Sequence, residues 1–332
     1  MSLMPTIYSS TDGGSPALTG QPGSLAALLD ACLVSGYGAG SSAKAPLGWT
    51  RSFTGGNVRV YRNEPVAGSG YSLRVDDSGV IGNARHAFLR AYETMSGLDT
   101  GVGPTPLAAD RTDGCLWPKS TEVSTAARAW WLIGNDRCFY LFVAIDGSSI
   151  DQAVPYFAGD IDSQMPSDQH CFVVSDSGLQ TYDGSISANV SALMTFPANG
   201  YAAAYPAVLP AGFIGRRHDR VVGAVAIDGR SCPLQQSNAG TWGGSGVPYP
   251  HPVNGGMLLA RGQVCDLGGI GPRGHMPGLY VPQHDHPLMD LQTIGGLTVI
   301  PGATLVAKSF RTGRLSSPSN GQVLFLVDGE WV

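Results

Sequence analysis

Two short clusters in the sequence have residue types and spacings that could bind a metal or carry out acid–base chemistry. His284 and His286 are two residues apart, so their side chains point the same way in an extended chain. A metal site there would need a third ligand, such as Asp290 or His251, and the sequence fixes neither nearby. An ordinary polar loop between prolines explains the same residues, and the sequence favours that interpretation.

Asp160 and Asp162, in the segment GDIDS, also share one face of an extended chain. Paired carboxylates could bind Ca²⁺ or serve a glycosidase as its two acids. A turn explains both residues as well, and no nucleophile elbow, zinc-protease helix or phosphate-binding loop accompanies them. We therefore predict no catalytic residue, cofactor or assigned metal ligand, and keep His284, His286, Asp160 and Asp162 as candidates only.

The elements that would position these residues begin with a helix near the start of the sequence. Ser24 stands where an N-cap belongs, and Gly36 stands where a helix ends in a left-handed residue. The apolar residues between them recur at helical spacing: Leu25, Leu28, Leu29, Cys32 and Leu33. The pattern predicts an amphipathic helix whose apolar side packs against a β-structure.

Most of the remaining sequence indicates short strands separated by turns. Segments 128–133 and 138–145 are apolar on both sides and flank the turn at 134–137, which predicts a hairpin covered on both faces. The segment HAFLRAYETM is ambiguous between helix and strand, and its aromatic residues favour a strand. We predict an all-β fold, β-sandwich-like, with many short antiparallel strands and one amphipathic N-terminal helix.

The predicted domain organisation has three parts. Residues 1–22 are rich in Ser, Thr, Gly and Pro and are expected to form an extended N-terminal arm that could lie across a neighbouring subunit. Residues 23–177 hold the helix and a first β-rich lobe. Residues 178–332 form a second β-rich lobe, which could be continuous with the first. Ala/Pro runs in its first part suit packing against another chain.

The composition of the 332-residue chain points to a covered surface. Hydrophobic residues make up 43% and charged residues only 14%, against roughly a quarter in typical soluble domains. So few charges indicate that other subunits cover part of the surface. The net charge is −5, and the one basic cluster, residues 216–220, is expected in a solvated or interface loop, so nucleic-acid binding is not expected. No signal peptide or membrane span is expected.

The six cysteines are dispersed along the chain. They form no CxxC motif, which argues against a zinc site made of thiolates. Several lie in apolar runs, so we predict buried free thiols that pack as small hydrophobic side chains. The alternative is disulfides formed in an oxidising environment, for which Cys115 and Cys232, in turn-rich stretches, are the candidates.

Several segments, in their order, resemble a family of virion structural proteins of tailed bacteriophages. These segments are LLDACLVSGYG with GWT, RVYR, GYSLRVDD, FLRAYETMSGLDTGVGPTP, YFAGDIDSQMPSDQHCFVV and MPGLYVPQHDHPL. The resemblance runs from Thr11 to the C-terminus and is weakest over residues 179–245. It implies a structural role in the particle and offers no catalytic residues.

The expected function is therefore a structural component of a tailed-phage virion, in the tail, neck/collar or baseplate, which assembles as an oligomer. Its expected partners are copies of itself and other phage virion proteins of the tail, neck or capsid. It would be made in the host bacterial cytoplasm and located in the virion. The alternative is a receptor- or glycan-binding or head-decoration protein on the same particle, which would contact a host surface receptor. A hydrolase using Asp160 and Asp162 is a third hypothesis.

Overall fold

The computed structural model has the predicted all-β fold. Residues are described in these ranges: 4–109, 111–176, 212–216, 218, 224–230, 248–266, 271–284, 288–297, 300–314 and 317–331. In them, strands form three antiparallel sheets, and one short helix, α1 (Ser24–Leu29), lies near the N-terminus. Short helical turns follow at η1 (Asp30–Ser35), η2 (Gly40–Ser42) and η3 (Ile150–Gln152). None of the helices in the described ranges is long and apolar enough to cross a membrane.

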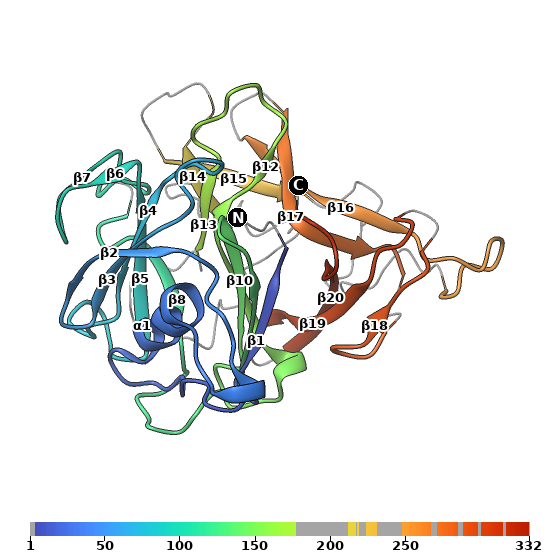
Figure 1. Cartoon of the computed structure of the whole chain (residues 1–332), viewed down its shortest axis with the longest axis horizontal. Coiled ribbons are helices and arrows are strands. Elements are labelled where there is room, and N and C mark those ends of the chain that lie inside the picture. The colour runs from blue at the N-terminus through green and yellow to red at the C-terminus, as the bar shows by residue number, and fades with distance from the viewer. Residues whose placement is uncertain are drawn as a thin grey trace.

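A five-stranded sheet lies beside α1, at the left of Figure 1, with the strand order β2-β3-β4-β5-β8. Its strands are β2 (Thr50–Gly55), β3 (Val58–Arg62), β4 (Ser72–Asp76), β5 (His86–Tyr92) and β8 (Cys115–Pro118). The ambiguous segment HAFLRAYETM forms strand β5 and, after Glu93, the short strand β6, so the preference for strand that its aromatic residues indicated is confirmed. Between β5 and β8, β6 (Thr94–Met95) and β7 (Gly101–Val102) pair to form a separate two-stranded sheet.

A thirteen-stranded sheet runs through both halves of the sequence. Its order is β1-β9-β10-β11-β13-β14-β15-β16-β17-β20-β19-β18, with β12 paired to β17. Its first strands are β1 (Thr6–Ser9), β9 (Trp130–Gly134), β10 (Cys138–Val143), β11 (Val154–Asp160), β12 (Asp162–Ser163) and β13 (Phe172–Asp176). The later strands are β14 (Gly212–Arg216), β15 (Ala224–Arg230), β16 (Leu259–Asp266), β17 (Gly271–Pro282), β18 (Thr293–Ile294), β19 (Leu305–Arg314) and β20 (Ser317–Leu326). Hydrogen bonding therefore continues from β13 to β14, across the expected lobe boundary.

The β9–β10 hairpin lies at the centre of the molecule, between the two outer groups of strands (Figure 1). Alternate residues of β10 face opposite sides because the side chains of a strand alternate. Phe139 and Leu141 pack in a core with α1 and the five-stranded sheet. Tyr140 and Phe142 pack in a second core with β19 and β20. The prediction of a hairpin covered on both faces is confirmed.

The helix buries the predicted stripe, but its N-terminus is capped differently. All five apolar stripe residues are at most 1% exposed. The predicted N-cap role of Ser24 is wrong, since its hydroxyl donates to the backbone oxygens of Thr19 and Gln21. The carboxylate of Asp77, from the turn after β4, instead accepts hydrogen bonds from the Leu25 and Ala26 amides.

The N-terminal segment belongs to the protein's own sheet. Strand β1 pairs with β9 along its whole length, and Tyr8 is fully buried. Leu18 forms a further bridge with Arg128 and is also fully buried. The prediction of an arm that lies across a neighbour is therefore wrong for residues 6–18. The segment is extended, but apolar side chains such as Tyr8 hold it on its own chain.

Four of the six cysteines are free thiols, and three of these are buried as the sequence predicted. Cys32, Cys115 and Cys138 are buried free thiols, and Cys171 is a partly buried one. The disulfide alternative is wrong for Cys115, which is free in strand β8. Its suggested partner, Cys232, lies outside the described residues.

Candidate functional site

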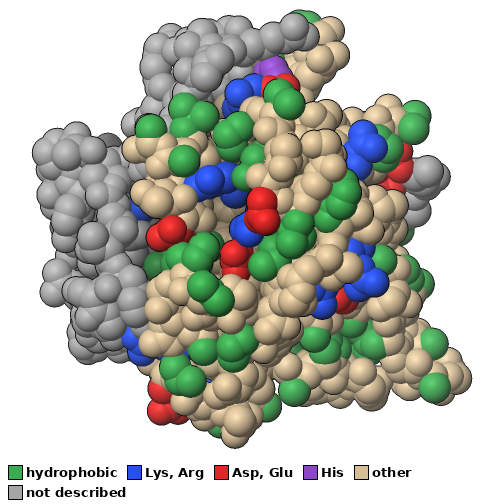
Figure 2. Space-filling model, turned by 90° about the vertical axis from the view of Figure 1, so that its left-hand side faces the viewer, with side chains coloured by type: hydrophobic (Ala, Val, Ile, Leu, Met, Phe, Trp, Pro, Cys, Tyr) green, Lys and Arg blue, Asp and Glu red, His purple; other side chains and the backbone are tan. Residues whose placement is uncertain are grey.

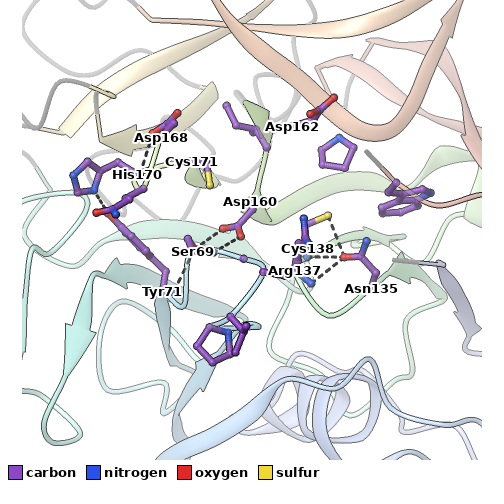
Figure 3. Close-up of a pocket in the computed structure, with 18 of the residues that line it drawn as sticks. Ser69, Tyr71, Asn135, Arg137, Cys138, Asp160, Asp162, Asp168, His170 and Cys171 are labelled. Atoms are coloured by element: carbon purple, nitrogen blue, oxygen red, sulfur yellow. Dashed lines mark hydrogen bonds between the residues drawn. The ribbon is translucent and has the colours of Figure 1, made fainter. Parts of the chain in front are cut away.

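A cavity of about 540 Å³ lies where the five-stranded sheet, the central hairpin and the C-terminal strands meet. Its lining comes from segments distant in sequence: 65–71, 135–138, 160–162 and 167–171, together with Glu93, Pro277 and Trp331. Figure 3 shows Asp160 near its middle, with Ser69, Tyr71, His170 and Cys171 around it. The cavity thus brings together residues from both halves of the chain.

Asp160, the last residue of β11, is a buried carboxyl at the centre of this site. Its Oδ1 accepts a hydrogen bond from the Ser69 hydroxyl at 2.5 Å, and its Oδ2 accepts one from the Ser69 amide at 2.7 Å. Burial raises the pKa of Asp160 to about 6, although the hydrogen bonds from Ser69 favour its charged form. Asp160 therefore changes charge in the mildly acidic range while it stays anchored to the loop that follows β3.

Asp162 lines the same cavity but has a different partner. Its Oδ2 lies 2.9 Å from Nη2 of Arg261 on strand β16. The two side chains are 29% and 38% exposed, so this is a half-solvated ion pair. Asp160 and Asp162 both line this cavity, but only Asp160 is enclosed.

Tyr71 and His170 form one wall of the cavity. Tyr71 Oη and His170 Nδ1 are 2.7 Å apart, and Nδ1 lies 3.9 Å from Oε1 of Glu93. Glu93 in turn is ion-paired with Arg216, the last residue of β14. Arg216 is only 9% exposed, so the prediction that it lies in a solvated or interface loop is wrong. These contacts tie the five-stranded sheet to the large sheet.

The loop before His170 is held by a buried ion pair. Arg273 is fully buried on β17, and its Nε and Nη2 lie 2.7 and 2.9 Å from the two carboxylate oxygens of Asp168. Burial acts to raise the pKa of Asp168, but the hydrogen bonds from Arg273 hold it below its usual value. Nη2 of Arg273 also donates to the His170 carbonyl at 2.7 Å. This bidentate pair fixes the cavity wall.

Trp331, near the C-terminus, lines the cavity beside Pro277 of β17. Gly278 of β17 adopts a φ of 64°, and a Cβ placed there would lie 2.2 Å from the Trp331 indole. The indole Nε1 donates to the Leu326 carbonyl at 2.9 Å. Trp331 therefore occupies the space that a side chain at position 278 would need. This close contact and the hydrogen bond to Leu326 fix the indole beside the cavity.

The histidine cluster predicted as a metal candidate lies elsewhere. His284 is buried, its Nε2 accepts the Leu258 amide at 2.7 Å, and its Nδ1 lies 3.1 Å from the Pro248 carbonyl. Both ring nitrogens thus bind backbone, and Asp290 binds Lys308 instead. His286 lies outside the described residues. In the described part of the chain, no three His, Cys, Asp or Glu side chains could jointly hold a metal ion.

The cavity presents chiefly hydrogen-bonding groups to a ligand. Asp160, Tyr71 and Glu93 offer oxygen atoms, and Arg137 adds a cation. Such a set suits a small molecule rich in hydroxyl groups, which can donate and accept at once. The sequence indicated Asp160 and Asp162 as candidate site residues. It did not indicate Ser69 or Tyr71, which lie 91 residues before Asp160 and 99 residues before His170 and belong to no motif.

Comparison with known proteins gives no assignment: no protein-family model matches this chain, and no curated protein matches it.

Proposed function

We propose that this protein is a structural component of a tailed-phage virion, in the tail, neck/collar or baseplate, and assembles through subunit interfaces. Its partners would be copies of itself and other virion proteins. The resemblance of its ordered motifs motivates the proposal. The main structural support for the proposal is that several Lys and Arg side chains are buried inside the molecule. Fewer charged groups are then left on the surface to interact with water.

Two of the three lysines in the sequence are buried. Lys119 is 1% exposed and pairs with Asp77, and Lys308 is fully buried and pairs with Asp290. Arginine is used in the same way: Arg111–Asp176 and Arg273–Asp168 are ion pairs with side chains at most 4% exposed. In the described part of the chain, these four cations therefore add no charge to the outer surface.

Apolar side chains are exposed at several loop positions. Val66 is 87% exposed, Val80 86%, Val253 87% and Met289 75%. Figure 2 shows one face on which apolar and uncharged surface predominates and the charged side chains are scattered. Interfaces between subunits are depleted of charged residues at their centres, so a surface of this kind suits burial against other proteins.

Particle composition tests this proposal directly. We expect the chain in purified virions at a fixed copy number by quantitative mass spectrometry, and a concentration-dependent oligomer by sedimentation of the isolated protein. Replacing Val66 and Val253 with serine should weaken assembly without changing the melting temperature, since both side chains are exposed. A protein that is missing from virions and stays monomeric at high concentration would contradict the proposal.

The cavity favours a second candidate function, a glycan-binding module on the same particle. Its hydrogen-bonding groups and its volume of about 540 Å³ suit a sugar residue. A glycan array with the purified protein tests this, with Tyr71→Phe as a variant that removes one hydroxyl from the wall. Binding that is lost in the variant supports the function, and an array without any binding removes it.

A further inference from the structure

An amine and a carboxyl group are in direct contact in the interior between α1 and the five-stranded sheet. Lys119 directly follows β8, and Asp77 directly follows β4. Nζ of Lys119 contacts Oδ1 of Asp77, and their side chains are 1% and 0% exposed. Strand β5 lies between β4 and β8 in the sheet. The Lys119–Asp77 contact therefore reaches across β5, which supplies neither of the two residues.

The groups around this pair hold both reacting atoms. Oδ2 of Asp77 accepts hydrogen bonds from the amides of Leu25 at 2.8 Å and Ala26 at 3.1 Å. Nζ of Lys119 also donates to the Gln21 carbonyl at 2.7 Å. The two amides are placed to stabilise negative charge on Oδ2, as the donors of an oxyanion hole do. The amine is thus fixed against a carboxyl whose other oxygen is already bound.

The dry environment favours the neutral forms of both groups. Burial raises the pKa of Asp77 and lowers the pKa of Lys119, against their mutual attraction. Nearby, His86 of β5 is 1% exposed, and burial together with Arg85 and Lys119 lowers its pKa to about 3. It therefore adds no positive charge beside the pair. A neutral amine is a nucleophile, and a protonated carboxyl can lose water.

We propose that Lys119 and Asp77 form an intramolecular isopeptide bond. Nζ attacks Cγ of the protonated carboxyl, the N–Cγ bond forms, and the developing negative charge on Oδ2 is held by the Leu25 and Ala26 amides. The Cγ–Oδ1 bond then breaks, and Oδ1 leaves as water with its own proton and one from the amine. The product is a neutral amide, and the step needs no oxidant, reductant or cofactor.

The bond would join the ends of two strands that are not neighbours in the sheet. It links the turn after β4 to the end of β8 across β5, and its oxygen would still accept the first amides of α1. A covalent bond there closes a loop of 42 residues along the chain. Loop closure of this kind limits the unfolded chain, as a disulfide does, but it does not depend on an oxidising environment.

A second buried lysine offers a control within the same chain. Nζ of Lys308 lies 2.9 and 3.1 Å from the two oxygens of Asp290, and it also donates to the carbonyls of Ile150 and Ser309. The side chain of Asp290 is 15% exposed, so water reaches this carboxylate. We expect this pair to remain ionic.

Mass spectrometry of the denatured full-length protein tests the proposal. The wild type should be lighter than its sequence by the mass of one water molecule. Lys119→Arg, which keeps a long basic side chain but cannot form this amide, should have its full mass. Lys308→Arg should show the same loss as the wild type. N-terminal processing is common to all three proteins, so it cancels in the comparison.

A tryptic map locates the bond, because water is also lost when an Asp-Gly sequence cyclises. The map should contain residues 75–85 joined to residues 112–128, since trypsin does not cut at an acylated Lys119. A wild type that keeps its full mass after prolonged incubation overturns the proposal, and so does a water loss that maps elsewhere. The wild-type map decides alone if Lys119→Arg does not fold.

Discussion

Asp77 and Asp160 are both buried carboxyls, but the regions around them differ. Asp77 lies in the closed interior beside α1, where Lys119 and two backbone amides surround it. Asp160 lies at the cavity, where Ser69 binds both of its oxygens. Burial raises the pKa of both groups. The closed region places a buried amine in direct contact with its carboxyl, and the open region leaves its carboxyl to be neutralised by a proton.

This difference separates a structural site from a responsive one. A carboxyl in contact with a buried lysine and two backbone amides holds the start of α1 against the strands of the five-stranded sheet. A carboxyl held by a hydroxyl and an amide changes charge with the solution, and it does so in the wall of a cavity. If the cavity binds a ligand, its affinity is expected to depend on pH, whereas an amide formed from Lys119 and Asp77 would have no titratable group and should not respond.

Removal of the buried Lys119 amine is expected to have the largest effect. Lys119→Met leaves the Asp77 carboxyl without its partner, which should destabilise the protein by about 3–5 kcal/mol. Urea denaturation at neutral pH measures the change. Lys44→Met is the control, because Lys44 and Asp12 are 3.7 Å apart with side chains 33% and 22% exposed. Equal losses in the two variants would contradict the contrast between closed and exposed sites.

The pH dependence of stability should identify Asp160. Its pKa rises from 3.8 to about 6 on folding, so the folded state binds more protons than the unfolded state between these values. Stability from this group is therefore present below pH 4 and is lost, by about 3 kcal/mol, as the pH rises through 6. Asp160→Asn should remove this loss. The measurement is the free energy of unfolding from pH 4 to 8 for both proteins.

Asp146→Asn provides a control of opposite sign. Burial acts to raise the pKa of Asp146, but hydrogen bonds from Ser148 and Arg311 hold it below its usual value. Its contribution to stability should therefore be lost as the pH falls, not as it rises. A wild-type curve that Asp160→Asn leaves unchanged would show that Asp160 is not the responsive group.

The smallest expected effect is at the other cavity carboxylate. Arg261→Ala breaks the half-solvated pair with Asp162, and exposed pairs of this kind contribute about 1 kcal/mol or less. Thermal unfolding should therefore change little. Arg273→Ala, which leaves Asp168 without its buried partner, serves for comparison and should destabilise the protein severalfold more. A large loss of stability in Arg261→Ala would mean that the Asp162–Arg261 pair is less accessible to solvent than its exposed fractions of 29% and 38% indicate.

Local patterns in the sequence were enough to predict the all-β fold and several of its elements. The helical stripe and the two-sided β9–β10 hairpin are properties of short windows, and both are confirmed. The N-cap was not predictable in this way, because the capping carboxylate of Asp77 lies 52 residues from the Leu25 amide. Ser24 had the right residue type, but Gly23 occupies the N-cap position, and the Ser24 hydroxyl donates to the Thr19 and Gln21 carbonyls instead.

The site was predictable only in part, for the same reason. Asp160 and Asp162 stand two residues apart, so a local pattern placed them on one face. Ser69 lies 91 residues before Asp160, and Tyr71 lies 99 residues before His170, so their meeting depends on how the sheets pack. Lys119 was notable in the sequence only as one of three lysines, and its burial follows from the same packing.

The pairing of β1 with β9 has a consequence for the order in which the protein is made. Ser10 and Trp130 meet across a separation of 120 residues, so the first strand leaves the ribosome long before its partner exists. During that interval Tyr8 and Leu18 have no sheet to cover them, and contacts so distant along the chain form slowly. Strand β1 is therefore expected to dock only after β9 has been made.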